Sequence, residues 1–250
     1  MRTTRWVTLI LVFGSLVACG LSAKVLTPTK EGSSPEGSTA TTLPKDIYPD
    51  SMGRLPLIKR DQLDENGKQV WDRMVARGNG QFKNGFTGPW NMRMYSPRVN
   101  EETYDLRYYL GHETKTLGSS LAELVILVAA REVSGVGNVF EFTNHEPGTA
   151  KLGLSQQVVD IVKYRKPPVG IDEKQACIIQ YGRELIGPTP VTPETFAHAR
   201  KLFGDQGVAE LTELLGQYVA MAMVNKAFDM HNSPQQEAVR ASVAKAFGHD

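Results

Sequence analysis

Apolar residues recur along most of the chain with the spacing of amphipathic helices. Near the start, Leu63, Val70 and Met74 keep roughly this spacing, and later segments repeat it between turn residues. No segment alternates convincingly between apolar and polar residues, which is the pattern of a half-buried strand. The pattern therefore predicts an all-α fold.

Turn and capping residues divide this pattern into separate helices. Asn138, Ser155, Asp172 and Thr192 are residue types that cap helix N-termini, and Pro147 ends or kinks the helix before it. Residues 80–99 mix Gly, Pro and aromatic residues and predict a loop packed by its own aromatic side chains, Phe86, Trp90 and Tyr95. We expect helices over residues 63–77, 99–110, 121–133, 138–146, 155–165, 172–186, 192–203, 208–228 and 233–247.

The segment 121–133 is apolar on nearly all sides, which predicts that its helix lies at the centre of the fold. Ser120 and Glu123, just before and within it, have the S-x-x-E spacing of a capping box. One interpretation of Glu123 is therefore a helix cap.

The N-terminus has the pattern of an export signal. Arg2 and Arg5 precede an apolar run that is too short to span a membrane and that ends in LVACG. This ending resembles the lipobox of bacterial lipoproteins, which implies a signal peptide over 1–18, lipid on Cys19 and, because Gly20 follows, the outer membrane. Ordinary signal cleavage, for example after Gly20, is the alternative. We expect export to the bacterial periplasm in either case.

Residues 19–50 are rich in Ser, Thr, Gly and Pro and predict a flexible tether, which leaves a folded domain over 51–250. A net charge of +1, with no basic stripe, gives no electrostatic case for binding nucleic acid. Once Cys19 is lipidated or removed, Cys177 has no partner for a disulfide, and its apolar surroundings favour a buried, inert thiol.

Glu141 and His145 are the best chemical lead in the sequence. They stand four residues apart on one predicted helix, between Phe140 and Phe142, so both side chains lie on the same face. A carboxylate beside an imidazole is suited to proton transfer near neutral pH. Two alternatives stay open: an ordinary surface pair, and a metal site completed by another histidine such as His112, His198 or His231.

Three motifs together resemble the carboxymuconolactone decarboxylase family. They are Glu123-Leu124 in the apolar helix, the segment FEFTNH at 140–145, and AKLGLS at 150–155. The resemblance covers roughly residues 52–232 and implies an AhpD-like helical bundle that assembles as a trimer or hexamer. Phe142 stands where the family commonly has Trp, and residues 133–138 form a longer connection than in the family.

The resemblance also implies roles for the site residues. His145 would be the general acid or base, Glu141 its orienting partner or second proton carrier, and Glu123 a proton relay. In the peroxidase branch of the superfamily a C-x-x-C motif precedes the histidine, but Asn138 and Glu141 hold those positions here, so thiol peroxidase chemistry is not expected. Arg131 or Arg93 would bind a substrate carboxylate.

We therefore expect a lyase or isomerase that needs no cofactor and no metal and acts on a small carboxylated or lactone substrate. A non-catalytic small-molecule binding or assembly protein on the same fold is the alternative. The apolar surface of residues 208–228, including Met221 and Met223, is more than one neighbouring helix covers, which favours a homo-oligomer.

The lipobox resemblance predicts that the mature protein fractionates with bacterial membranes through Cys19. Cys19→Ser should release the protein or block its processing, because the lipidated thiol is then missing. Fractionation and the mass of the mature N-terminus measure this. Unchanged processing and localisation of Cys19→Ser would rule out the lipoprotein interpretation.

Overall fold

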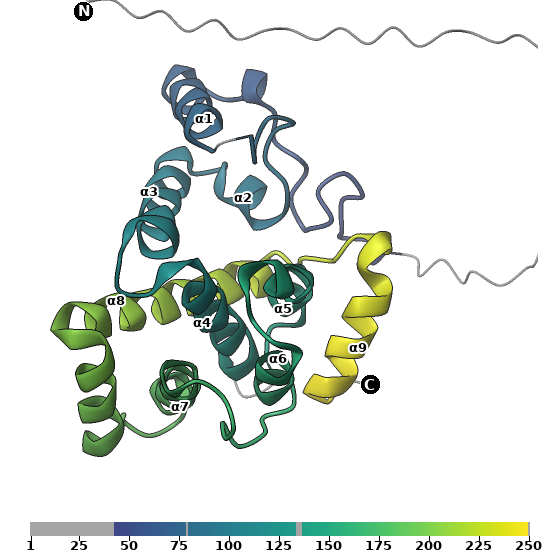
Figure 1. Ribbon diagram of the computed structural model, residues 1–250. Helices are drawn as coiled ribbons and strands as arrows, with labels where there is room; N and C mark the ends of the chain where they lie inside the picture. Colours follow the sequence, from purple (N-terminus) through teal and green to yellow (C-terminus); the bar gives the residue numbers. More distant parts are fainter. Residues whose placement is uncertain (1–42, 79, 134–136, 250) are drawn as a thin grey trace, which may run out of the picture. The chain divides into compact units, whose positions relative to one another are not determined.

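The computed structural model describes residues 43–78, 80–133 and 137–249, and helices account for most of them (Figure 1). The described residues contain one isolated β-bridge, between Tyr48 and Gly53, and no strand. The all-α prediction is confirmed. The predicted signal peptide, Cys19 and most of the predicted tether lie outside the described residues.

The principal helices and the short helical turns follow one another in this order: η1 (Arg60–Gln62), α1 (Glu65–Arg77), α2 (Gly88–Arg93), α3 (Pro97–Tyr108), η2, a π-helical turn (Tyr109–Glu113), α4 (Gly118–Glu132), α5 (Val139–His145), η4 (Glu146–Leu152), α6 (Gln156–Lys163), α7 (Glu173–Ile186), α8 (Pro193–Ala227), η5 (Pro234–Gln236) and α9 (Glu237–Phe247).

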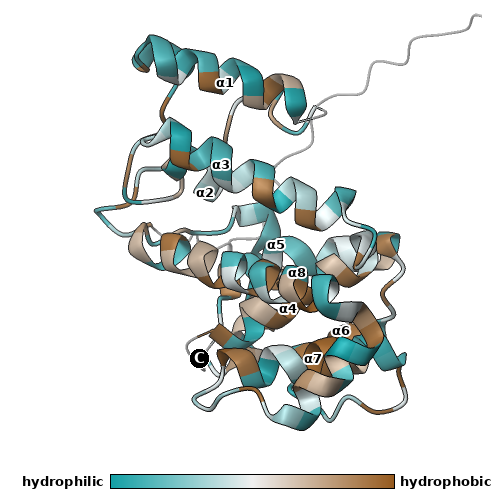
Figure 2. Cartoon of the chain, turned by 90° about the vertical axis from the view of Figure 1, so that its left-hand side faces the viewer, coloured by the Kyte–Doolittle hydropathy of each residue, from teal (hydrophilic) through white to brown (hydrophobic). Residues whose placement is uncertain are grey.

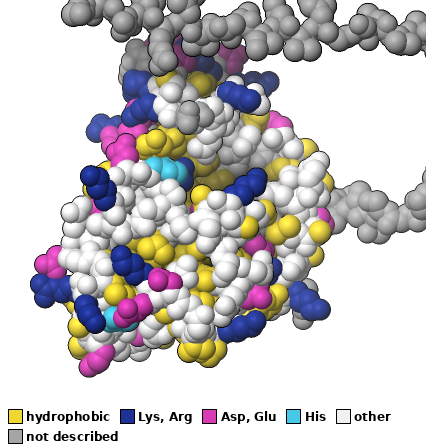
Figure 3. All heavy atoms as spheres, viewed as in Figure 1, with side chains coloured by type: hydrophobic (Ala, Val, Ile, Leu, Met, Phe, Trp, Pro, Cys, Tyr) yellow, Lys and Arg dark blue, Asp and Glu magenta, His cyan; other side chains and the backbone are white. Residues whose placement is uncertain are grey.

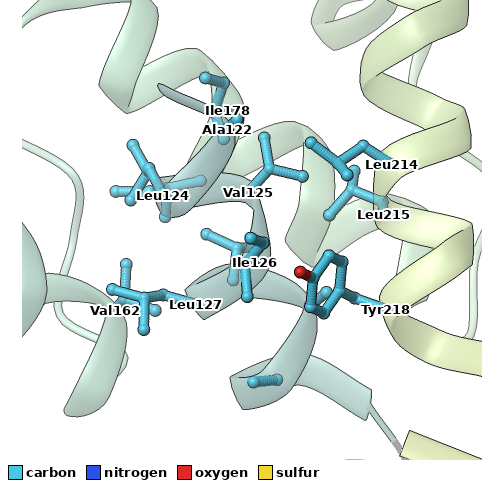
Figure 4. Packing of buried hydrophobic residues seen from close by; sticks show 14 of the residues in the cluster. Ala122, Leu124, Val125, Ile126, Leu127, Val162, Ile178, Leu214, Leu215 and Tyr218 are labelled. Carbon is cyan, nitrogen blue, oxygen red and sulfur yellow. The ribbon is translucent and has the colours of Figure 1, made fainter. Parts of the chain in front are cut away.

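Helix α4 is the centre of the core, as its apolar pattern predicts. It contacts α5, α6, α7 and α8, and Leu124, Val125 and Leu127 are fully shielded from solvent. Figure 4 shows these side chains in one apolar cluster with residues of α7 and α8, among them Ile178, Leu214 and Leu215. In Figure 2, α4 carries mainly hydrophobic residues, whereas α1 and α3 show many hydrophilic ones. The rest of the bundle is arranged around α4 because its surface is apolar on nearly all sides.

The capping-box interpretation of Ser120 and Glu123 is wrong. Helix α4 already begins at Gly118, with Leu117 in the N-cap position and no side-chain cap. Glu123 therefore lies within the helix, and its carboxylate is available for a contact with another element.

Other predicted helix boundaries are confirmed. The side chains of Asn138, Ser155, Asp172 and Thr192 each accept a hydrogen bond from a backbone N–H in the first turn of the next helix. The two helices predicted over 192–203 and 208–228 together make up α8, which has a kink between them at Gly204, where φ is 70° and ψ is 176°. Only glycine adopts this conformation without strain.

Two predicted loops contain more structure than expected. Residues 80–99 include the short helix α2, and Tyr95 is 44% exposed instead of packing inward. The ordered fold also begins before residue 51: Ile47 is buried, and the backbone N–H of Tyr48 donates to the Gly53 carbonyl at 2.8 Å. The tether predicted over 19–50 therefore extends too far toward the C-terminus.

The surface is mixed in charge. Figure 3 shows charged side chains of both signs spread over one face, with apolar side chains between them. Among the described residues, no helix combines the length and hydrophobicity that a membrane span requires.

Two glycines provide a matched test of the packing around α4. A Cβ at Gly182 in α7 would lie 2.5 Å from Val128 Cγ1 of α4, whereas a Cβ at Gly216 in α8 would meet no atom within 4 Å. We expect Gly182→Ala to lower the free energy of unfolding by about 1–3 kcal/mol through overpacking. Gly216→Ala should raise it by roughly 0.5–1 kcal/mol, because alanine favours the helix.

Urea unfolding followed by circular dichroism measures both changes. Equal effects of the two substitutions would contradict the close approach of α7 to α4.

Candidate active site

Helices α4 and α5 bring three titratable side chains into one hydrogen-bonded line. The Nδ1 atom of His145 lies 2.7 Å from Oε1 of Glu123, and its Nε2 atom lies 3.1 Å from Oε1 of Glu141. The contact between Glu141 and His145 follows from their spacing on α5, as the sequence predicts. The contact with Glu123 joins two helices and links residues 22 positions apart.

The turn between α4 and α5 makes this meeting possible. Gly137 has a φ of 79°, and a Cβ there would collide with the ring of Phe247. Asn138 then donates its backbone N–H to the Ala130 carbonyl at 2.6 Å, and its side chain caps α5 through the N–H of Glu141. These contacts fold α5 back onto α4. Glu123 and His145 therefore meet although they lie on different helices.

Helix α8 encloses the line from a second side. Asn225 Nδ2 donates to Oε2 of Glu141 at 2.9 Å, and both residues are buried. The ring of Tyr218 stands edge-on to the His145 ring, with 5.7 Å between the ring centroids. Asn225 therefore holds the second oxygen of Glu141, and Tyr218 provides an aromatic wall for the imidazole.

The two carboxylates hold a proton on His145. Burial disfavours the imidazolium, but the hydrogen bonds to Glu123 and Glu141 outweigh this effect and raise the pKa of His145 to about 9. For Glu141, burial acts in the opposite direction, yet the contacts with His145 and Asn225 lower its pKa. At neutral pH the line is therefore an imidazolium between two carboxylates.

The two carboxylates differ in their remaining contacts. Both oxygens of Glu141 are hydrogen-bonded, and its side chain is only 7% exposed. Glu123 is 13% exposed, and within the described part of the chain its Oε2 accepts no hydrogen bond. Glu123 therefore has an oxygen available to a bound molecule, whereas Glu141 is fully occupied in positioning His145.

The two predicted substrate-binding arginines lie in different surroundings. Arg93 is buried near Glu141. Burial lowers the pKa of Arg93, and the negative charge of Glu141 partly offsets this effect. Arg131 donates to the Lys163 carbonyl at 3.0 Å and stacks on Phe247 at 4.3 Å. These contacts join α4 to α6 and α9, so the expectation of Arg131 beside the substrate is not supported.

Asn225 and Tyr218 were not identified as site residues from the sequence. Tyr218 has the spacing of a core residue on α8, so the sequence pattern does not reveal that its ring packs against His145. Asn225 directly follows the apolar run AMAMV and is buried in the fold. A polar residue next to such a run is the sequence signal that could have identified it, because a buried polar group needs a partner.

The remaining chemical candidates lie elsewhere. Burial raises the pKa of the Cys177 thiol to about 11, which disfavours the thiolate. Within the described ranges, no three His, Cys, Asp or Glu side chains converge as metal ligands. His198 pairs with Glu173 at 3.1 Å, and His231 lies 3.5 Å from Asp229.

No family model and no curated protein matches this chain. Solved structures do match. A variant of the debrominase Bmp8 in complex with 2,3,4-tribromopyrrole aligns with a TM-score of 0.58 at 11% identity, covering 75% of this chain and 95% of that one. Apo Bmp8 aligns with a TM-score of 0.55 at 11% identity, covering 77% and 97%.

An uncharacterised peroxidase-related protein from Ralstonia eutropha JMP134, described as an alkylhydroperoxidase AhpD core, aligns with a TM-score of 0.53 at 11% identity, covering 74% of this chain and 94% of that one. The chain has the AhpD-like fold. This confirms the expected helical bundle. Within this AhpD-like fold, α4 supplies Glu123 and α5 supplies Glu141 and His145.

The raised pKa of His145 predicts a pH-dependent stability. Its ordinary value is 6.5 and its value in the fold is about 9. The stabilisation is therefore fully present below about pH 6.5 and is lost as the pH rises through 9, by roughly 3 kcal/mol. Urea unfolding at several pH values measures it.

His145→Gln should remove this part of the pH dependence, because glutamine does not titrate. An unchanged slope in this variant between pH 6.5 and 9 would show that the pKa of His145 is not raised.

Proposed function

We propose that the protein is an acid/base enzyme that needs no cofactor, a carboxymuconolactone decarboxylase-like lyase or isomerase of the non-thiol kind. One observation carries the proposal: a single imidazole joins two carboxylates, and one of these keeps an available oxygen at a partly exposed position. Perturbed titratable groups that share hydrogen bonds are typical of catalytic sites.

The contacts support distinct roles for the three residues. Glu123 is the proton-transfer group that meets the substrate, because its Oε2 is available. His145 donates to Glu123 and holds that carboxylate in position. Glu141 and Asn225 position the imidazole and stabilise its charge. His145 thus acts as an acid and a charge partner in the resting site, and not as the base.

The proposed reaction is a proton transfer at carbon next to a carbonyl group. Glu123 takes the proton, and the electron pair of the broken C–H bond moves into the carbonyl system to give an enolate. For an isomerase, Glu123 returns the proton to a different carbon. For a decarboxylase, the C–C bond to a carboxylate breaks in place of the C–H bond, carbon dioxide leaves, and the enolate that keeps the electron pair receives a proton that the His145 imidazolium passes through Glu123. Neither path needs an oxidant or a reductant other than the substrate itself.

The neighbours in fold are compatible with small-molecule chemistry. One is a debrominase in complex with a tribrominated pyrrole, and another is described as peroxidase-related. This chain has Asn138 and Glu141 at the positions expected for a C-x-x-C motif, which favours acid/base chemistry over thiol chemistry.

We also propose that the enzyme is exported, anchored to the membrane by lipid on Cys19, and assembled into a homo-oligomer such as a trimer or hexamer. On α8, Met223 is 49% exposed, whereas Met221 is buried, so the family resemblance is the main support for this assembly.

Substitutions in the line test the proposal. On an established substrate, Glu123→Gln and His145→Gln should each lower kcat by about 10²–10⁴-fold, the usual effect of losing a positioned acid or base. The double variant should be little worse than the worse single variant, because the residues act as a unit. Glu213→Gln is the matched control, since Glu213 is an exposed carboxylate on α8.

Steady-state kinetics on lactones and small carboxylic acids measures these effects. If Glu123→Gln and His145→Gln both keep full activity, the proposed mechanism is wrong and a binding protein on this fold becomes the better account.

A further inference from the structure

Two arginines beside the active site have no acidic partner. Arg93 of α2 and Arg107 of α3 place their guanidinium carbons 5.7 and 5.5 Å from the centre of the Trp90 ring. Among the described residues, neither arginine forms an ion pair. Other arginines of this region do: Arg73 and Arg77 both bind Glu101. In the part of the chain that the structure describes, Arg93 and Arg107 therefore lack a direct ion pair, as does Arg131, whose guanidinium group instead donates to the Lys163 carbonyl.

Both guanidinium groups also keep unused hydrogen-bond donors. Nη1 of Arg93 and Nε of Arg107 are buried and have no hydrogen-bond partner in the described part of the chain. Arg93 is only 9% exposed. A buried donor without an acceptor is costly, and more so when it carries charge. An acceptor supplied by a ligand would remove this cost.

Packing, and not a countercharge, holds these arginines in position. The side chain of Asn91 bonds the backbone N–H of Ile58 at 3.1 Å and its carbonyl at 3.0 Å, which fixes α2. Asn100 Nδ2 donates to the Trp90 carbonyl at 2.9 Å and ties α2 to α3. Helix α2 in turn contacts α8, which carries Tyr218 and Asn225. The site is therefore assembled before any ligand binds.

Arg93 and Arg107 belong to the same electrostatic environment as the hydrogen-bonded line. Arg93 interacts with Glu141 and Tyr218, and Arg107 also interacts with both. Burial raises the pKa of Tyr218, so its hydroxyl stays protonated and available as a donor. Nearby, burial and the charge of Arg107 lower the pKa of His112, which is therefore neutral at neutral pH.

The charges of this region do not cancel. Arg93, Arg107 and the His145 imidazolium contribute three positive charges, and Glu123 and Glu141 contribute two negative ones. One positive charge is left over in a largely buried site. A ligand with a single negative charge would neutralise it, whereas a doubly charged phosphate would reverse it.

We propose that Arg93 and Arg107 form an anion subsite beside the Glu123–His145–Glu141 line and that it binds the carboxylate of a small monocarboxylate substrate. The planar guanidinium group matches the geometry of a carboxylate. The inference that this ligand is the substrate rests on the proposed function.

Binding of benzoate tests the subsite directly. Isothermal titration calorimetry on the folded wild-type chain should show binding of benzoate and at least about 10-fold weaker binding of benzamide, which has a similar shape but no charge. Arg93→Gln and Arg107→Gln should each weaken benzoate binding by about 10–100-fold. Arg98→Gln is the matched control, because Arg98 lies on α3 with an 88% exposed side chain.

The outcomes separate the subsite from the proposed reaction. Benzoate and benzamide of equal affinity on the wild-type chain would overturn the subsite, whether or not the variants fold, as would folded glutamine variants that keep full benzoate affinity. Glu123→Gln should keep benzoate binding while losing turnover. If it keeps both, the subsite stands and the proposed reaction fails. If turnover depends on Glu123 but neither arginine affects binding, the reaction stands and the subsite fails.

Discussion

The hydrogen bonds from one imidazole to two carboxylates are the interaction on which the candidate site depends. Glu123 comes from the central helix α4, and Glu141 and His145 come from α5, so the imidazole links two elements of the core. A buried acid without a partner would be protonated or would destabilise the fold. Here both carboxylates share a hydrogen bond with the imidazolium, and Asn225 completes the bonding of Glu141. The same contacts that stabilise the site also determine its protonation.

The sequence predicts the bundle because its signals are local. The apolar run of α4, the caps at Asn138 and Ser155, and the four-residue spacing of Glu141 and His145 depend only on neighbouring residues. The contact of Glu123 with His145 depends on how the turn at Gly137 folds α5 back, and spacing along the chain does not encode that. The S-x-x-E spacing of Ser120 and Glu123 predicts a cap, but the helix begins at Gly118 and Glu123 instead binds His145 of another helix.

The charged side chains illustrate this limit most clearly. Arg131 and Arg93 were equivalent candidates in the sequence, yet Arg131 binds the Lys163 carbonyl while Arg93 lies near Glu141. Arg107 and Asn225 carry no sequence signal as strong as the motif around His145. Their importance follows from the packing of α2, α3 and α8 against the central pair of helices. A site that combines surplus positive charge with a carboxylate poised for proton transfer suits a small organic anion.

The most direct test of this account is the protonation of His145 at neutral pH. Nuclear magnetic resonance of the chain labelled with ¹⁵N at its histidine rings, assigned with His145→Gln, distinguishes an imidazolium from a neutral tautomer. The account predicts that both ring nitrogens of His145 carry a proton at pH 7.5 and that the ring titrates near pH 9. A neutral ring at pH 7.5, with one nitrogen unprotonated, would contradict it.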